Sequence, residues 1–263
     1  MTAPADLVAP ATNAVVTPAA YLISAVLAVV GCAGVCIGAR RAPGPWAHAV
    51  ARVLGVLLAA DAVSFVVAIV VGGTFSAKTS LPLPLCDMAV LVAAAACWWR
   101  SPVLVELTYF WGLAGTLQGA ITPDLNAGFP HLVFFQYVVG HFGIVMAALL
   151  LVVGLRIPAR PHAVRRIFGI TAAYTALVGL VDWTTGANYM FLRRPPSNWT
   201  LLRLLGPWPW YVVSAAGVAF VLIVALNSPF WWIRRRGSQA TTPATGAHAA
   251  GTGAHAAGTG TKA

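Results

Sequence analysis

The sequence predicts an all-α membrane protein, a polytopic bundle of about seven transmembrane helices. Of its 263 residues, 59% are hydrophobic and only 8% are charged, whereas soluble globular domains carry roughly 25% charged residues. Seven apolar runs each approach the roughly 20 residues that a helix needs to cross the hydrocarbon core of a bilayer. A water-soluble fold of this length could not hide so much apolar surface, so a soluble enzyme is excluded.

The predicted spans follow one another with short polar connections. The third span is the shortest, because Pro82 and Pro84 interrupt its start and proline cannot continue a helix. The spans are expected at about residues 19–39, 49–71, 83–99, 103–121, 132–155, 167–185 and 208–226.

The two ends of the chain differ from this apolar middle. Residues 1–17 form a Pro/Ala/Thr-rich leader without the charged region of a signal peptide, so we expect the first span to be retained. Residues 237–263 are low in complexity and contain the run TGAHAAG twice. Gly, Ala, Thr and His cannot build a packed core. The expected organisation is a flexible leader, a seven-helix domain over 18–236, and a disordered tail over 237–263.

The distribution of basic residues predicts an orientation in the cell membrane. Connections on one side carry eleven arginines, and those on the other side carry four basic residues. Because loops rich in Lys and Arg stay in the cytoplasm, we expect the N-terminus outside and the C-terminus inside. The eleven are Arg40, Arg41, Arg52, Arg100, Arg156, Arg160, Arg165, Arg166, Arg234, Arg235 and Arg236, and the four are Lys78, Arg193, Arg194 and Arg203.

The net charge of +10 does not indicate a nucleic-acid partner, because these arginines form short clusters between apolar runs and no basic face. The four cysteines, Cys32, Cys36, Cys86 and Cys97, all lie in apolar runs. Cys32 and Cys36 share a helix face, but no His or carboxylate stands beside them, so no metal site is predicted. No phosphate-binding loop or other cofactor motif is present either, and we expect membrane lipid to be the principal partner.

Ionisable side chains inside the spans are the candidates for function, because each costs several kcal/mol in lipid unless it is paired. They are Asp61, Asp87, Glu106, His141 and Asp182. Glu106 lies near the cytoplasmic end, where we expect a pair with Arg100. The remaining polar groups converge on the outer half of the bundle. We expect a polar cluster of Asp87, Gln118, Asp124, His131 and Asn188 around Cys86 and His141.

Cys86 and His141 are the residue types of a nucleophile and its base. A thiol becomes a strong nucleophile beside an imidazole, and a His deep in a span needs a polar partner or a wet cavity. Asp87 or Gln118 would orient the ring in such a pair. A histidine held by a structural hydrogen bond is the alternative interpretation of His141.

Several segments resemble the YwaF-like family of bacterial integral membrane proteins. They are LPLPLCD from Leu81, YFWGLAGTLQGAITPDL from Tyr109, FPHLVFFQYVVGHFGIV from Phe129, NYMFLRRPP from Asn188 and GPWPWY from Gly206. That family is distantly similar to eukaryotic membrane proteins that transfer or hydrolyse fatty acyl groups, including an ether-phospholipid acyltransferase and hydrolases of branched fatty-acid esters.

The resemblance implies a lipid acyltransferase or acyl hydrolase with a fatty-acyl substrate. Cys86 corresponds to the nucleophile of those proteins and His141 to their partner histidine. One position departs from the family pattern PLHLC, because this chain has Pro84 where the histidine stands. Likeness of this kind transfers function only by analogy, so a non-enzymatic role remains the alternative: a small-ligand transporter, a binding protein or an accessory membrane protein.

Overall fold

The computed structural model describes residues 18–123, 125, 128–195 and 204–240. The regular secondary structure of these residues is entirely helical and includes no strand. The α-helices are α1 (Pro18–Arg41), α2 (Pro45–Val71), α3 (Leu85–Trp99), α4 (Pro102–Trp111), α5 (Leu117–Ile121), α6 (Leu132–Leu149), α7 (Ala163–Thr185) and α9 (Trp210–Ala240). Two π-helical turns, η2 (Gly112–Thr116) and η3 (Leu150–Gly154), and a 3₁₀ turn, η4 (Tyr189–Phe191), complete the list.

Each predicted span coincides with helical residues, and the helix ends follow the local sequence. Pro45 and Pro102 stand in the first turns of α2 and α4, where a missing N–H costs nothing. Gly186 ends α7 in the left-handed conformation, with φ of 74°. The leader, residues 1–17, lies outside the described residues. At the other end α9 continues to Ala240, into the segment predicted to be a disordered tail, and the rest of that tail is not described.

Five of the described helices are long and apolar enough to cross a membrane: α1, α2, α6 with η3, α7 and α9. α3 is shorter, with 15 residues, or about 22 Å at about 1.5 Å per residue. α4, η2 and α5 follow one another without a break from residue 102 to 121. The protein is therefore a helical membrane protein with several passes, and the number seven remains a prediction.

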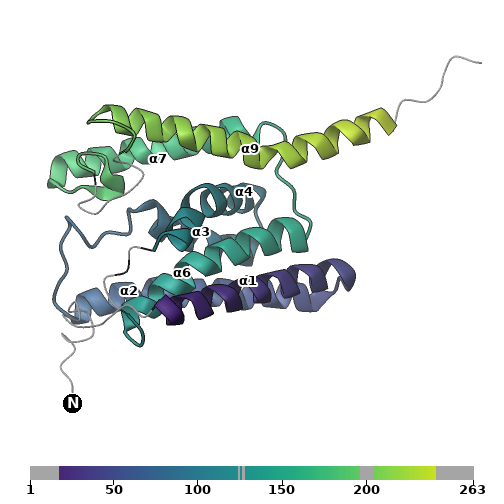
Figure 1. Ribbon diagram of the computed structural model, residues 1–263, viewed down its shortest axis with the longest axis horizontal. Coiled ribbons are helices and arrows are strands. Elements are labelled where there is room, and N and C mark those ends of the chain that lie inside the picture. Colours follow the sequence, from purple (N-terminus) through teal and green to yellow (C-terminus); the bar gives the residue numbers. More distant parts are fainter. Residues whose placement is uncertain (1–17, 124, 126–127, 196–203, 241–263) are drawn as a thin grey trace, which may run out of the picture. The chain divides into compact units, whose positions relative to one another are not determined.

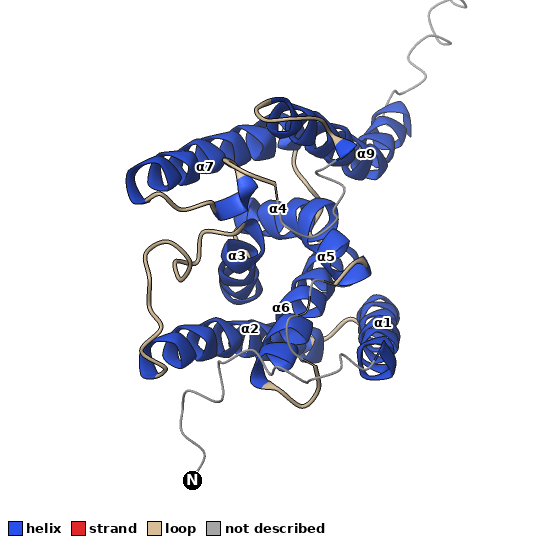
Figure 2. Cartoon of the chain, turned by 60° about the vertical axis from the view of Figure 1, so that its left-hand side comes forward, coloured by secondary structure: helices blue, strands red, loops and turns tan. Residues whose placement is uncertain are grey.

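The centre of the bundle is formed by α3 and α4. Figures 1 and 2 show them between α2 and α6 on one side and α7 on the other. Every residue of α4 from Val105 to Trp111 is buried. In an apolar medium the outer helices are as hydrophobic as the core. The core helix α4 therefore differs from its neighbours in how much of it is buried, and not in how hydrophobic it is.

α2 and α3 pack most closely at Gly55. A Cβ atom placed on Gly55 would fall 2.9 Å from the Cβ of Cys97 and 3.1 Å from the carbonyl oxygen of Ala94. A larger residue would force the two helices apart, which is the reason that small residues occupy helix contacts in membranes. Gly55 therefore fixes the spacing of α2 and α3 at one end of the pair.

The sequence predicted that Glu106 of α4 pairs with Arg100, and the structure does not show this pair. The Glu106 carboxylate is 2% exposed and accepts hydrogen bonds from Arg160 and Arg166, with Nε–Oε distances of 3.0 Å and 2.8 Å. Arg160 adds a backbone N–H bond of 2.9 Å. The guanidinium of Arg100 has buried nitrogens without a hydrogen-bond partner among the described residues. The prediction was wrong because the two binding arginines come from distant positions in the chain.

The described chain divides at Pro229 into two units. Within the second unit, the guanidinium of Arg235 lies 3.6 Å from the ring centroid of Trp231, and that of Arg236 lies 4.1 Å from the ring centroid of Trp232. Cation–π pairs of this kind combine the aromatic and basic residues that occur where a helix leaves the hydrocarbon core.

Candidate functional site

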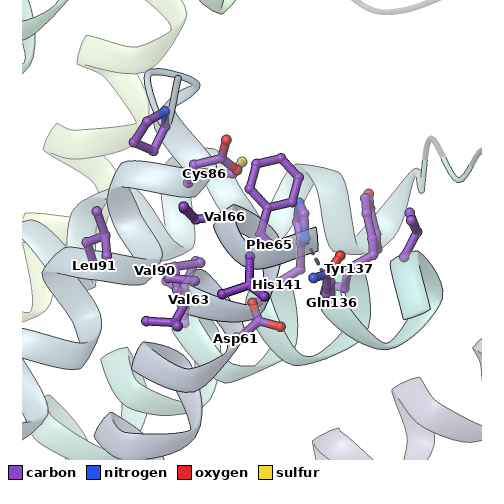
Figure 3. A pocket seen from close by; sticks show the side chains of 17 residues that line it. Asp61, Val63, Phe65, Val66, Cys86, Val90, Leu91, Gln136, Tyr137 and His141 are labelled. Carbon is purple, nitrogen blue, oxygen red and sulfur yellow. Dashed lines mark hydrogen bonds between the residues drawn. The ribbon is translucent and has the colours of Figure 1, made fainter. Parts of the chain in front are cut away.

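A cavity of about 390 Å³ lies between α2, α3 and α6, in the half of the bundle where α2 ends and α3 and α6 begin (Figure 3). Most of its lining is apolar, as in most small-molecule sites. The polar side chains that line it belong to Asp61, Cys86, Asp87, Gln136, Tyr137 and His141.

Cys86 reaches this cavity because the segment before α3 is non-helical and its last residues, 81–84, are half-buried. The Leu81 backbone N–H donates to the Tyr189 hydroxyl at 3.0 Å, and the Tyr174 hydroxyl donates to the Leu83 carbonyl at 2.8 Å. Non-helical backbone is tolerated at membrane depth only where the protein itself satisfies its polar groups. These two tyrosines therefore allow α3 to start inside the bundle.

Tyr189 is held in turn by Asp182, a fully buried residue of α7. One carboxylate oxygen of Asp182 accepts the backbone N–H of Tyr189 at 2.8 Å, and the Tyr189 hydroxyl donates to the Ala77 carbonyl at 3.0 Å. Asp182, which the sequence marked only as an ionisable residue within a span, is thus a positioning residue for the segment that leads to Cys86.

Cys86 stands in the first turn of α3, beside Asp87. Pro84, the residue before α3, provides no side-chain hydrogen bond to the helix start. Backbone N–H groups in the first turn of a helix lack partners within the helix and favour negative charge beside them. The N–H groups near Cys86 are therefore suited to stabilise an oxyanion.

The Thr116 hydroxyl, at the end of the π-helical turn η2, lies near the Cys86 thiol. The two groups do not form a hydrogen bond, since the buried Thr116 Oγ1 atom has no hydrogen-bond partner in the described part of the chain. A buried hydroxyl without a partner costs free energy, and π-helical turns are frequent at functional sites. Thr116 is therefore a candidate functional residue.

His141 is oriented by Tyr137, one turn earlier on α6. The His141 Nδ1 atom lies 3.0 Å from the Tyr137 carbonyl oxygen, and the two rings stack with centroids 3.9 Å apart. A carbonyl oxygen only accepts, so Nδ1 carries the proton in this bond. In the neutral ring Nε2 is then unprotonated and is able to accept a proton.

Cys86 and His141 pack against the same short helix, formed by η2 and α5. The thiol is next to Thr116. The His141 ring lies against Gly119, where a Cβ atom would fall 2.8 Å from Cδ2 and 2.9 Å from Nε2. Positions three apart share one helix face. The thiol and the imidazole therefore meet this helix about one turn apart and line the same cavity.

Two carboxylates share the cavity. Asp61 of α2 and Asp87 of α3 are close enough for their charges to repel each other. An oxygen of Asp61 also lies 3.4 Å from the position that a Cβ of Gly140 would take. Both carboxylates line the cavity and could accept hydrogen bonds from a bound molecule.

Three predicted members of the polar cluster do not line the cavity with Cys86, Asp87 and His141. The side chain of Gln118 is exposed and does not line the cavity. His131 caps α6, its Nδ1 accepting the Val133 N–H at 3.3 Å. The Asn188 side-chain oxygen Oδ1 accepts hydrogen bonds from the backbone N–H groups of Arg193 and Arg194, at 3.0 Å each. Asp124 lies outside the described residues.

The predicted polar cluster did not include two residues that line the cavity: Gln136, and Asp61, which the sequence had marked only as an ionisable residue within a span. Gln136 Nε2 donates to the Ser64 hydroxyl at 2.8 Å and so ties α6 to α2. A signal for Asp61 was available, because it stands ten residues before the end of α2, or about 15 Å at about 1.5 Å per residue. His141 lies at a similar depth from the start of α6.

The described residues contain no group of three or more His, Cys, Asp or Glu side chains arranged to hold a metal ion. The chemistry that this cavity offers is therefore that of a thiol, an imidazole and two carboxylates beside apolar walls.

Residues 12–227 match the TMEM164 family. The chain belongs to the TMEM164 family. Every residue that lines the cavity lies within the part of this TMEM164 family member that matches. Neither a curated protein nor a solved structure matches the chain. The resemblance to YwaF-like proteins stays a prediction.

Proposed function

We propose that this TMEM164 family member transfers or hydrolyses fatty acyl groups of membrane lipids, with Cys86 as nucleophile and His141 as base. The observation that carries the proposal is the position of a thiol and an imidazole in the wall of one largely apolar cavity. A fatty acyl ester has both the apolar chain and the electrophilic carbonyl that such a site would accommodate.

The reaction has two steps. The Cys86 sulfur attacks the acyl carbonyl carbon while His141 Nε2 takes the thiol proton, and the leaving alcohol of the lipid receives that proton as the ester bond breaks. The acyl group is now a thioester on Cys86. An acceptor hydroxyl or water then attacks the thioester, gives its proton to His141 and releases the acyl product. The proton returns to the thiolate, which restores the resting enzyme.

The surrounding residues support these steps. The Tyr137 carbonyl keeps Nδ1 protonated, which leaves Nε2 as the base. The first-turn amides of α3 would stabilise the negative oxygen of the tetrahedral intermediate. Pro84, which replaces the histidine of the YwaF-like pattern, forms the start of α3, so His141 is the one imidazole among the described residues that line the cavity.

For the topology we propose seven passes through the cell membrane, with the N-terminus outside and the C-terminus in the cytoplasm. The arginine distribution supports this orientation. The unbroken run of helix from residue 102 to 121 is about 30 Å long at about 1.5 Å per residue and would supply one pass. α3 would supply the other pass, because the non-helical segment before it, half-buried at residues 81–84, would cross part of the membrane thickness.

The test is covalent trapping of the acyl group. The full chain, purified in detergent and returned to phosphatidylcholine vesicles, is incubated with lipid carrying a radiolabelled acyl chain, and hydroxylamine-sensitive label on the protein is measured. We expect a thioester on Cys86 in the wild type, none in Cys86→Ser, and little in His141→Ala. Cys32→Ser, which changes a thiol of α1 outside the cavity, should keep the label. Folded protein without any thioester in the wild type would instead support a non-enzymatic ligand-binding role.

A further inference from the structure

The cavity opens sideways, between α2 and α3, rather than only toward the end of the bundle. Five of its lining residues have large apolar side chains that are also exposed on the protein surface, with exposed fractions between 36% and 61%. They form the α2–α3 opening, which consists of Val63, Phe65, Val66, Val67 and Leu91. None of them is polar, so the opening meets an apolar surrounding.

The position of the opening along the helices places it at hydrocarbon depth. Val63 stands eight residues before the end of α2, which is about 12 Å at about 1.5 Å per residue, and Leu91 lies in the middle of α3. At that depth the space beside a membrane helix is filled by lipid acyl chains.

The cavity is lined by different side chains, polar and apolar, along the length of its helices. Cys86, Asp87 and Gln136 lie toward the end where α3 begins, whereas Val90, Leu91 and Ile144 lie further along their helices. Val90 and Ile144 are buried, with exposed fractions of 8% and 0%. The Asp61 carboxylate lies at the level of Val90, since both approach the position that a Cβ of Gly140 would take. A lipid bound here would place its ester group among the polar side chains and its hydrocarbon chain along the apolar residues Val90 and Ile144.

We propose that one acyl chain of a membrane lipid enters through the α2–α3 opening directly from the bilayer and extends along Val90 and Ile144. Val63 and Leu91, which flank the opening from opposite helices, would determine which chains are admitted. The inference rests on the proposed function only for the position of the ester beside Cys86. Binding of the chain itself does not require that Cys86 react.

The test is photolabelling of buried residues. The full chain in phosphatidylcholine vesicles receives a trace of phosphatidylcholine with a diazirine on one acyl chain, and labelled residues are mapped after irradiation. Bulk lipid will label exposed residues such as Leu22 and Val26 of α1. Only a chain inside the cavity can label Val90 and Ile144, so we expect label at both, in the wild type and in Cys86→Ser alike.

Blocking the opening should remove that label. Val63→Trp is expected to lower labelling of Val90 and Ile144 by roughly tenfold, the effect of about 1.4 kcal/mol of lost binding free energy, while labelling of α1 stays unchanged. Val56→Trp is the matched control, since Val56 is an exposed valine of the same helix, 54% against 61%, and does not line the cavity. Leu91→Trp repeats the block from α3 if Val63→Trp does not fold.

The outcomes separate this inference from the proposed function. Label in the cavity without any thioester on Cys86 would uphold the inference and refute acyl transfer. A thioester on Cys86 together with no label at Val90 and Ile144, or with label that neither tryptophan reduces, would overturn the inference and leave acyl transfer standing. Cross-links across the α2–α3 opening between two copies of the chain, without lipid label inside, would show that protein covers it and would also overturn the inference.

Discussion

The edge of the His141 imidazole lies directly on the backbone of Gly119. A Cβ atom at position 119 would stand 2.8 Å from Cδ2 of the ring, closer than two carbon atoms approach in folded proteins. The ring cannot simply rotate away, because its Nδ1 donates to the Tyr137 carbonyl and its face stacks on the Tyr137 ring. The glycine therefore determines where the base of the proposed reaction stands.

Gly119→Ala should displace His141 and reduce thioester formation on Cys86 by roughly tenfold or more, since small misplacements of catalytic groups are costly. Overpacking of this kind typically destabilises by about 1–3 kcal/mol, which thermal unfolding in detergent would register. Gly34→Ala is the control, because nothing lies within 4 Å of a Cβ at that helix position. Equal activity of the two variants would refute the positional role of Gly119.

Thr116→Val should separate activity from stability. The substitution keeps the shape of the side chain and removes a buried hydroxyl that has no hydrogen-bond partner among the described residues. The melting temperature should therefore stay the same or rise. If the hydroxyl assists the Cys86 thiol, thioester formation should become slower, and Thr116→Ser should restore it. An unchanged rate in Thr116→Val would show that the hydroxyl has no part in the reaction.

Glu106→Gln should destabilise the bundle. The carboxylate is buried and binds two arginines whose side chains are 41% and 29% exposed. Because water can partly replace the carboxylate around these arginines, we expect a loss of about 1.5–3 kcal/mol, the range for a hydrogen bond to a charged group. Hydrogen bonds to Glu106 also raise the pKa of Arg160 above its ordinary value. Arg100→Gln should have a much smaller effect on thermal unfolding if Arg100 does not bind Glu106. Similar losses in both variants would contradict the pairing seen in the structure.

Tyr189→Phe should loosen the segment that carries Cys86. The hydroxyl accepts the Leu81 N–H and donates to the Ala77 carbonyl. Its removal leaves both backbone groups unpaired, at a cost of about 1–3 kcal/mol for each group that stays buried. We expect a lower melting temperature and faster alkylation of Cys86 by a maleimide. Tyr109→Phe, on α4 and away from this segment, should leave Cys86 alkylation unchanged.

The orientation of the chain can be tested with fusions at the C-terminus. The arginine distribution predicts a cytoplasmic C-terminus, so a fluorescent protein fused there should fluoresce and alkaline phosphatase should be inactive. An active phosphatase would reverse the topology. It would also move the end of the cavity near the start of α3 to the cytoplasmic side.

The sequence by itself was sufficient for the helices. Apolar runs bounded by proline and glycine specified where α1, α2, α6 and α7 begin and end within a few residues, because helix formation depends on neighbours close in the chain. It also indicated that Pro82 and Pro84 would shorten α3. It brought Cys86, Asp87 and His141 forward as candidates, since ionisable groups and thiols stand out in apolar spans.

The partners of those groups were decided only by the tertiary structure. Glu106 binds arginines 54 and 60 residues away, a choice that no local pattern contains. Gln118 faces away from the cavity, and the π-helical turn just before it shifts the phase of the helix relative to a regular α-helix. Asp61 enters the site because Gly55 and Gly140 let α2 approach α3 and α6. Which polar side chains share a cavity thus depends on the packing of whole helices, a non-local property that helical periodicity does not encode.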